Sequence, residues 1–218
     1  MSNIKACIFD LDGTLTDTLN AIAHFGNFAL SKFGFAELPT ENYKIYAGNG
    51  RDKLIHRILG EHNADTPELF ERVRDVYDTA YESDYLYETN AFDGICSLLD
   101  ELKKMEIKIA VCSNKPDNVV HFVTDNIFGK NYFDAVCGVI DGMPVKPDPY
   151  TPLKIASELG VTPEDCLFLG DTNVDIITAK NAGMTSVGVL WGFRTRTELV
   201  QAGADYIAEN PHTILQLI

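Results

Sequence analysis

The 218-residue sequence is poor in basic residues. Lys and Arg number 18 against 32 Asp and Glu, which gives a formal net charge of −14. Nucleic acid or an anionic membrane surface requires a basic face on its partner, so the composition argues against both kinds of partner. An anionic substrate stays possible, because a few local cations or a metal ion can govern a pocket.

The sequence also lacks organised cysteines and long apolar runs. Its five cysteines include no CxxC pair, and four of them lie in apolar, strand-like runs: Cys7, Cys112, Cys137 and Cys166. We therefore expect buried free thiols in a reducing compartment, without a disulfide framework or a thiolate metal site. No apolar run of 18 residues and no signal-like N-terminal stretch occurs, so we expect a cytoplasmic protein.

Two aspartates follow the first apolar run of the chain. Residues 6–9 predict a buried strand, and Asp12 with Gly13 predicts a turn just beyond it. Asp10 and Asp12 are one residue apart, so each carboxylate raises the pKa of the other, and partial burial adds to this effect. A bound cation would offset the repulsion. Taken alone, the stretch is also compatible with a strand that ends in a solvated turn.

The hydrophobic pattern divides the chain into two parts. Residues 16–86 contain several amphipathic helical patterns and no convincing strand, so we expect one helical module there. From residue 92 onward, helical patterns alternate with short apolar runs that predict strands, namely residues 107–112, 135–140, 166–169 and 185–190. Such alternation is typical of βαβ units and predicts a parallel sheet covered by helices on both faces.

Polar residues directly follow the predicted strands. Ser113 and Asn114 follow one strand, Asp171 follows another, and Asp10 follows the first. Ligands of open α/β sheets bind beyond the carboxyl ends of the strands, so we expect these side chains to meet at one edge.

Four segments in this order resemble the motifs of the haloacid dehalogenase superfamily: residues 10–14 (DLDGT), 113–115 (SNK), 146–149 (KPDP) and 170–175 (GDTNVD). The resemblance extends over essentially the whole chain. It implies a Rossmann-like, doubly wound parallel sheet with a small all-helical cap of the C1 type inserted after the first strand. The expected catalytic core is residues 1–15 and 87–218, and the expected cap is residues 16–86. Residues 188–194 are also similar to the branch that includes phosphoglycolate phosphatases.

The resemblance implies hydrolysis of a small-molecule phosphate monoester. Asp10 would be the nucleophile that becomes an aspartyl-phosphate, and Asp12 would be the general acid and base. Lys146 would neutralise the phosphoryl group and the nucleophile, while Ser113 and the Asn114 amide would bind a phosphoryl oxygen.

A magnesium ion is the implied cofactor, since Mg²⁺ prefers oxygen ligands. Asp10 and Asp171 would bind the ion by their side chains, and Asp12 by its backbone carbonyl. Asp175, one helical turn beyond Asp171, would bind it directly or through a water molecule. Gly13 would let the backbone approach the phosphoryl group closely.

Each of these residues also has an ordinary interpretation when taken alone. Ser113 could cap a helix, Lys146 could be a solvated loop residue, and Asp171 and Asp175 could be a cap and a surface acid. Lys115 and Asp148 lie within the motifs, but we interpret them as structural or surface residues.

The helical module offers a candidate for substrate selection. Residues 48–50 (GNG) precede Arg51 at a predicted helix start, where backbone N–H groups and the guanidinium could bind a carboxylate. This would suit 2-phosphoglycolate, although a plain loop with a solvated arginine is an equal alternative. Nucleotide or sugar-phosphate phosphatase, pyrophosphatase and phosphoglucomutase activities remain open, as does a receiver-like phospho-acceptor module. We expect a monomer or a homodimer.

Overall fold

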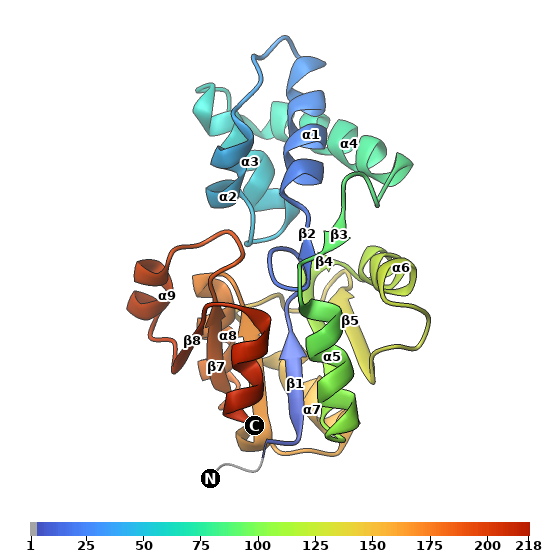
Figure 1. Ribbon diagram of the computed structural model, residues 1–218. Helices are drawn as coiled ribbons and strands as arrows, with labels where there is room; N and C mark the ends of the chain where they lie inside the picture. The colour runs from blue at the N-terminus through green and yellow to red at the C-terminus, as the bar shows by residue number, and fades with distance from the viewer. Residues whose placement is uncertain (1–3) are drawn as a thin grey trace. The chain divides into compact units, whose positions relative to one another are not determined.

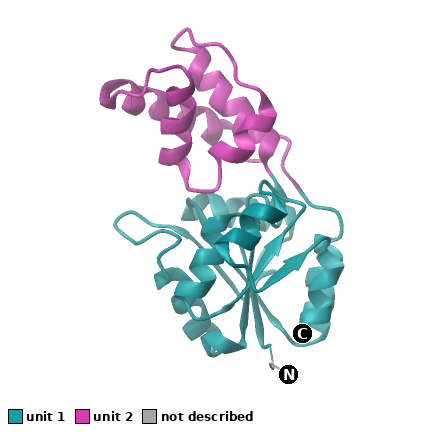
Figure 2. Ribbon diagram, turned by 90° about the vertical axis from the view of Figure 1, so that its left-hand side faces the viewer, with its two compact units in different colours: residues 1–17, 91–218 teal, residues 18–90 magenta. Residues whose placement is uncertain are grey.

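A computed structural model of the protein describes residues 4–218. The chain forms two compact units, which are residues 1–17 with 91–218 and residues 18–90 (Figure 2). These boundaries lie slightly C-terminal to the ones expected from the sequence. The reason is that two short strands, β2 (Thr16–Asp17) and β3 (Asn90–Ala91), pair with each other where the chain passes between the units.

A six-stranded sheet with the order β5-β4-β1-β6-β7-β8 forms the centre of the first unit. All of its strand pairs are parallel, which confirms the predicted doubly wound sheet. The strands are β1 (Ala6–Phe9), β4 (Lys108–Pro116), β5 (Ala135–Val139), β6 (Cys166–Gly170), β7 (Thr185–Val189) and β8 (Tyr206–Ala208). Because β4 and β6 flank β1 on opposite sides, the topological switch point lies at the carboxyl end of β1.

Helices lie on both faces of this sheet (Figures 1 and 2). They are α5 (Ile95–Lys104), α6 (Asp117–Ile127), α7 (Tyr150–Leu159), α8 (Asn173–Asn181) and α9 (Arg196–Ala202), with the 3₁₀ segments η2 (Pro163–Asp165) and η3 (Pro211–Leu217). Helix α9 was not expected. The sequence does contain the capping residues of this helix. Thr195 accepts a hydrogen bond from the Glu198 N–H at its start, and Gly203 adopts a left-handed conformation at its end.

The expected end of one strand was wrong. The strand expected to end at Cys112 continues to Pro116, with a register shift against β5 in between. The closing helix that the sequence predicts over residues 211–218 is present as the 3₁₀ helix η3.

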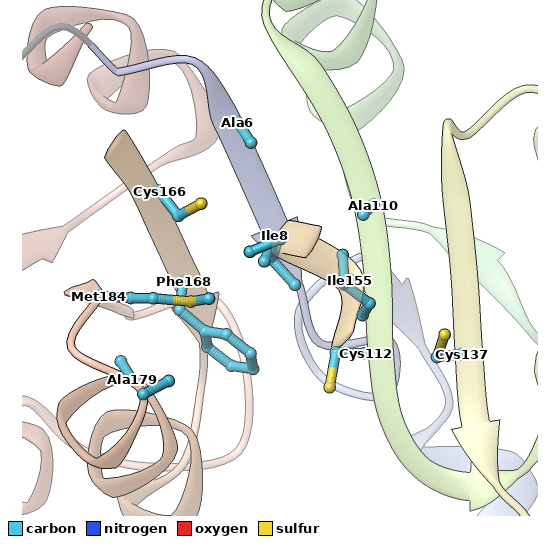
Figure 3. Close-up of a cluster of buried hydrophobic side chains, with 12 residues drawn as sticks. Ala6, Ile8, Ala110, Cys112, Cys137, Ile155, Cys166, Phe168, Ala179 and Met184 are labelled. Carbon is cyan, nitrogen blue, oxygen red and sulfur yellow. The ribbon is translucent and has the colours of Figure 1, made fainter. Parts of the chain in front are cut away.

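Apolar side chains fill one face of the sheet. Ala6 and Ile8 of β1 and Phe168 of β6 point to the face that Ile155 of α7 and Ala179 of α8 cover (Figure 3). The cysteines Cys112, Cys137 and Cys166 belong to the same cluster, so the prediction of buried free thiols there is confirmed. Burial raises the pKa of the Cys112 thiol to about 12, so these sulfurs act as small apolar groups.

The second unit is helical, apart from Asn90, the first residue of the short strand β3. Its elements are α1 (Leu19–Ser31), η1 (Thr40–Asn42), α2 (Tyr43–Tyr46), α3 (Arg51–Glu61) and α4 (Pro67–Ser83). Thr66 caps α4 by accepting a hydrogen bond from the Leu69 N–H at 3.3 Å, and Pro67 occupies the first helical position, both as the sequence predicts. Gly60 lies within α3, next to its last residue. In the part of the chain that the structure describes, no helix combines the length and apolarity needed to cross a membrane.

Candidate active site

Four buried charged side chains come together at the carboxyl ends of β1 and β6. Asp10 follows β1 directly, Asp171 follows β6, and Asp175 lies in the first turn of α8. Lys146 comes from the loop between β5 and α7. The parallel sheet brings these segments, far apart in the sequence, to its switch point.

Lys146 is the central cation of this group. Its Nζ atom lies 2.9 Å from Asp10 Oδ1 and 2.7 Å from Asp175 Oδ1. The side chain of Lys146 is 2% exposed, and those of Asp10 and Asp175 are 8% and 1% exposed. Such a buried, doubly paired ammonium is not the solvated loop lysine that the sequence alone allowed.

The electrostatics of the site show a shortage of positive charge. Burial, followed by the charge of Asp175, raises the pKa of Asp10 to about 7 even though Lys146 opposes the shift. Burial and the charges of Asp175 and Asp10 raise the pKa of Asp171 well above its ordinary value. Burial alone would lower the pKa of Lys146, but Asp10 and Asp175 raise it above the ordinary value, so the ammonium stays charged. Asp10 and Asp175 therefore share one lysine, and the third carboxylate, Asp171, lies beside them.

This acidic cluster could hold a metal ion. Asp10, Asp171 and Asp175 each offer a carboxylate oxygen, and the three oxygens lie within 4.8 Å of one another. All three are hard oxygen donors, the type that Mg²⁺ prefers, and a divalent cation would supply the missing positive charge.

The carboxylates differ in how much of their acceptor capacity is used. Asp10 Oδ1 accepts the Leu11 N–H at 2.7 Å in addition to its contact with Lys146, whereas Oδ2 accepts no hydrogen bond from the residues the structure describes. Asp175 Oδ1 contacts Lys146, and its Oδ2 accepts the Thr172 N–H at 3.0 Å and the Thr172 hydroxyl at 2.7 Å. Asp10 Oδ2 is therefore open to a ligand, while Asp175 has little capacity left.

Asp171 is held by Thr14 and Phe193, two residues of the family-like segments to which the sequence by itself assigns no role of their own. Its Oδ2 accepts the Phe193 N–H at 2.7 Å, and its Oδ1 accepts the Thr14 hydroxyl at 3.2 Å. A Cβ atom at Gly192 would lie 2.2 Å from the Gly13 carbonyl oxygen and 2.4 Å from Asp171 Cβ. Only glycine allows this approach. The run 188–194 was noticed as a family-like segment, but its contact with Asp171 depends on the tertiary fold.

Ser113 and Asn114 end the buried part of β4. The Asn114 side chain forms two hydrogen bonds with the backbone of Lys146, donating to its carbonyl at 3.1 Å and accepting from its N–H at 2.9 Å. The side chain of Asn114 thus positions Lys146 and is not directed by these bonds to a ligand. Ser113 is buried, and its hydroxyl oxygen accepts the Lys115 N–H at 3.3 Å.

Asp12 and Gly13 form the turn after β1. The Asp12 carboxylate is 21% exposed and contacts Lys115, which the sequence led us to interpret as structural or surface. Gly13 has a φ of 82°, and a Cβ atom there would lie 2.4 Å from Asp171 Oδ2. Its N–H donates to the Thr16 carbonyl at 2.8 Å, so this N–H group is already used within the turn.

Arg51 lies in the second unit, at the start of α3. Gly50, with a φ of 83°, precedes it as the N-cap residue, so the chain break and helix start expected from the sequence are present. The guanidinium of Arg51 contacts Asp78 at 2.7 Å and Asp52 at 2.9 Å. A substrate carboxylate would have to compete with these two partners, and the role of Arg51 in substrate binding stays a prediction.

Comparison with known proteins gives a consistent result. The chain is 29% identical to the phosphoglycolate phosphatase of Vibrio cholerae, covering 100% of the chain and 98% of that protein. It is 31% identical to the phosphoglycolate phosphatase of Nitrosospira multiformis, with coverages of 99% and 96%. The crystal structure of a candidate phosphoglycolate phosphatase from Lactobacillus delbrueckii matches with a TM-score of 0.95 at 29% identity, covering 100% of this chain and 99% of that one.

The model of the haloacid dehalogenase-like hydrolase family matches residues 7–189. This span includes Asp10, Ser113, Lys146 and Asp171, so the matched region contains the buried constellation described above. The chain belongs to the haloacid dehalogenase-like hydrolases.

Proposed function

We propose that the protein is a Mg²⁺-dependent phosphatase that hydrolyses a small-molecule phosphate monoester through an aspartyl-phosphate on Asp10. The observation that carries this proposal is the buried arrangement of Asp10, Lys146, Asp171 and Asp175, in which three carboxylates lie close together and one lysine contacts two of them. A phosphoryl group and a divalent cation together would satisfy this arrangement.

In the first step, Asp10 Oδ2 attacks phosphorus while the bond from phosphorus to the ester oxygen breaks. Oδ2 is the oxygen without a partner among the described residues, whereas Oδ1 is held by Leu11 and Lys146. Holding Oδ1 fixes the direction of Oδ2, which reduces the entropic cost of reaching the transition state. The electron pair of the broken bond goes to the ester oxygen, and Asp12 supplies its proton.

In the second step, water attacks the aspartyl-phosphate and returns Asp10 to its carboxylate form. Asp12, now unprotonated, takes the proton from this water. Lys146 remains an ammonium throughout, because both of its carboxylate neighbours raise its pKa, and it neutralises charge on the phosphoryl oxygens. Dividing the reaction into two steps matters because phosphate monoesters need accelerations of up to about 10²¹-fold.

The donor set fits Mg²⁺, with Asp10 and Asp171 as side-chain ligands and the Asp12 carbonyl as a third protein ligand. Because Thr172 and Lys146 already use most of the acceptor capacity of Asp175, we expect that residue to act through a water molecule. When bound, the ion would neutralise phosphoryl charge and orient the group for in-line attack.

For the substrate, 2-phosphoglycolate is our first choice. The support is the match along the whole chain to relatives named phosphoglycolate phosphatase. We propose that residues 18–90 act as the substrate-selecting cap, with Arg51 as the candidate contact for a substrate carboxylate.

A phosphate-release assay on a panel of esters with and without Mg²⁺ tests this proposal. The panel should include 2-phosphoglycolate, nucleoside monophosphates, sugar phosphates, pyrophosphate and p-nitrophenyl phosphate. We expect Mg²⁺-dependent turnover with the highest kcat/KM for 2-phosphoglycolate. Preference for another ester would move the substrate assignment only, whereas no turnover of any ester would contradict the phosphatase assignment.

A burst experiment separates a hydrolase from a mutase. A hydrolase should release phosphate from its phosphoenzyme rapidly, without an acceptor sugar. A long-lived phosphoenzyme that passes its phosphoryl group to a sugar phosphate would contradict hydrolysis as the main reaction.

A further inference from the structure

Lys115 makes an ion pair with Asp12 that the proposed mechanism does not yet use. Its Nζ atom lies 3.0 Å from Asp12 Oδ1 and 3.1 Å from Asp12 Oδ2. The side chain of Lys115 is only 8% exposed, although it is long and charged. Both carboxylate oxygens are therefore engaged by one ammonium, which restricts the rotation of the carboxylate.

The backbone that follows Lys115 contacts the neighbouring strand β5. Pro116 pairs with Val139 of β5, and Asp117 Oδ1 accepts the Gly138 N–H at 2.8 Å. A Cβ atom at Gly138 would lie 2.7 Å from the Lys115 carbonyl oxygen, so glycine is required for this close approach. These contacts place the backbone from which the Lys115 side chain starts, and Asp12 holds its ammonium end.

Another lysine on β4, Lys108, forms an ordinary surface ion pair that serves for comparison. Lys108, at the opposite end of β4, contacts Asp134 at 2.9 Å, with side chains that are 50% and 29% exposed. Exposed pairs of this kind contribute little to stability and place few constraints on geometry. The Lys115 pair differs because the lysine side chain is only 8% exposed and its partner is the proposed acid and base.

We propose that Lys115 is a positioning residue that holds the Asp12 carboxylate in the orientation needed for proton transfer. The inference rests on the proposed phosphatase function. Asp12 follows β1 in a turn, and its own backbone does not determine where its carboxylate points. Lys115 determines this from the neighbouring strand, so the carboxylate reaches the ester oxygen in the first step and the attacking water in the second. The ammonium itself gives up no proton.

The consequence should depend on the leaving group. An alkoxide leaving group, such as that of 2-phosphoglycolate, needs a proton as the bond to phosphorus breaks. The p-nitrophenolate group leaves without one. A badly placed Asp12 should therefore slow phosphoenzyme formation from the first substrate much more than from the second.

The experiment measures phosphoenzyme formation by rapid quench with both substrates. Lys115→Met removes the ammonium at similar length, Lys115→Arg keeps a cation that can reach a carboxylate, and Lys108→Met is the control on the same strand. Melting temperatures with and without Mg²⁺ check that each variant is folded. If Lys115→Met fails to fold, Lys115→Gln replaces it, because its amide can still donate to Asp12 without the charge.

We expect Lys115→Met to slow phosphoenzyme formation from 2-phosphoglycolate by about 10- to 100-fold, and from p-nitrophenyl phosphate by less than about 3-fold. Lys115→Arg should recover part of the loss, and Lys108→Met should match the unmodified protein. Combining Lys115→Met with Asp12→Asn should slow the 2-phosphoglycolate reaction no further than Asp12→Asn alone, since both changes remove the same function.

Three results would overturn the inference. Equal losses with the two substrates would assign Lys115 a structural role. A raised KM for 2-phosphoglycolate with unchanged kcat would make Lys115 a substrate contact, and additive effects with Asp12→Asn would separate the two residues. Failure of the unmodified protein to hydrolyse any ester would instead refute the proposed function, so the two failures are distinguishable.

Discussion

The two carboxylate oxygens of Asp10 are not equivalent, and the proposed mechanism gives them different tasks. Oδ1 is held by the Leu11 N–H and by Lys146, while Oδ2 has no partner among the described residues. The two oxygens of Asp175 also differ in their partners: Oδ2 accepts two hydrogen bonds from Thr172, and Oδ1 contacts Lys146. Individual hydrogen bonds, rather than residue types alone, separate a candidate nucleophile from a carboxylate that mainly holds its neighbours.

Asp10→Asn tests the nucleophile. The amide keeps the shape of the side chain and can still accept the Leu11 N–H, but it cannot form the aspartyl-phosphate. We expect kcat to fall by at least about 10⁴-fold in a phosphate-release assay with Mg²⁺. Activity within tenfold of the unmodified protein would exclude Asp10 as the nucleophile.

Asp12→Asn tests the acid and base. The variant can still be phosphorylated by an ester with a good leaving group, but it lacks the base for the second step. We expect kcat to fall by about 10²- to 10⁴-fold and the phosphoenzyme to accumulate, detected as added phosphoryl mass on the intact protein. Near-normal turnover would show that our acid and base assignment is wrong.

Gly192→Ala tests the close packing beside Asp171. The added Cβ atom would lie 2.2 Å from the Gly13 carbonyl oxygen, so the loop or the Asp171 side chain must shift. We expect the free energy of unfolding to fall by about 1–3 kcal/mol in urea titrations, together with weaker Mg²⁺-dependent activity. Gly60→Ala is the control, because a Cβ atom within α3 meets nothing within 4 Å, and it should stabilise by about 0.5–1 kcal/mol.

At the scale of elements, the first turn of α8 both begins a helix and completes the site. Asp175 accepts the N–H and the hydroxyl of Thr172, which precedes the helix, and its other oxygen contacts Lys146. A carboxylate in the first helical turn also interacts favourably with the helix dipole. Local helix capping therefore helps to hold a charged residue in a buried position.

Thr172→Ala should reveal this double role. Loss of the buried hydroxyl leaves Asp175 one donor short, so we expect about 1–2 kcal/mol of lost stability and a lower kcat. Thr66→Ala is the matched control, because Thr66 caps the exposed start of α4 in the other unit. It should lose about 1 kcal/mol in thermal unfolding. The outcome that contradicts us is an unchanged kcat for Thr172→Ala.

In the helical unit, the side chain of Arg57 holds the segment that precedes its own helix. Its guanidinium donates to the carbonyl oxygens of Ile45 at 3.1 Å and Tyr46 at 2.8 Å, and to Asn49 Oδ1 at 2.7 Å. These bonds tie α3 to the end of α2 and to the glycine-containing loop 48–50. Residues 48–50 are therefore held by a side chain from the following helix.

At the scale of the whole molecule, three buried carboxylates with one lysine make the folded state sensitive to pH and to metal. The pKa of Asp10 is raised to about 7, and that of Asp171 is raised well above its ordinary value. The pKa of an aspartate in an unfolded chain is about 4. The folded protein therefore binds more protons than the unfolded chain above this pH, and its stability falls as pH rises through the interval from about 4 to 7.

We expect the melting temperature of the metal-free protein to fall by at least about 3 °C between pH 5 and pH 8. Mg²⁺ should raise the melting temperature more at pH 8 than at pH 5, because protons compete with the metal for the same carboxylates. Asp10→Asn removes one of these acids, so it should flatten the pH dependence and weaken the effect of Mg²⁺. A metal-free melting temperature that rises between pH 5 and pH 8 would contradict this view of the site.

The sequence by itself determined the fold class and the positions where the chemistry is concentrated. Apolar runs such as residues 6–9 and 166–169 predict strands because burial on both faces of a parallel sheet demands continuous apolar residues. The polar residues that follow them, including Asp10 and Asp171, are expected at one edge because parallel strands end on the same side. These inferences need only local pattern and the geometry of a sheet.

Only the tertiary structure decided which partner each side chain has. Lys115 contacts Asp12 across 103 positions of sequence, and the Phe193 N–H reaches Asp171 from the loop after β7. No local pattern encodes such pairs, because they depend on strand order, on register and on close approaches at Gly138 and Gly192. The sequence therefore located the carboxylates, while the packing of the sheet determined which cation holds each one and which oxygen remains open.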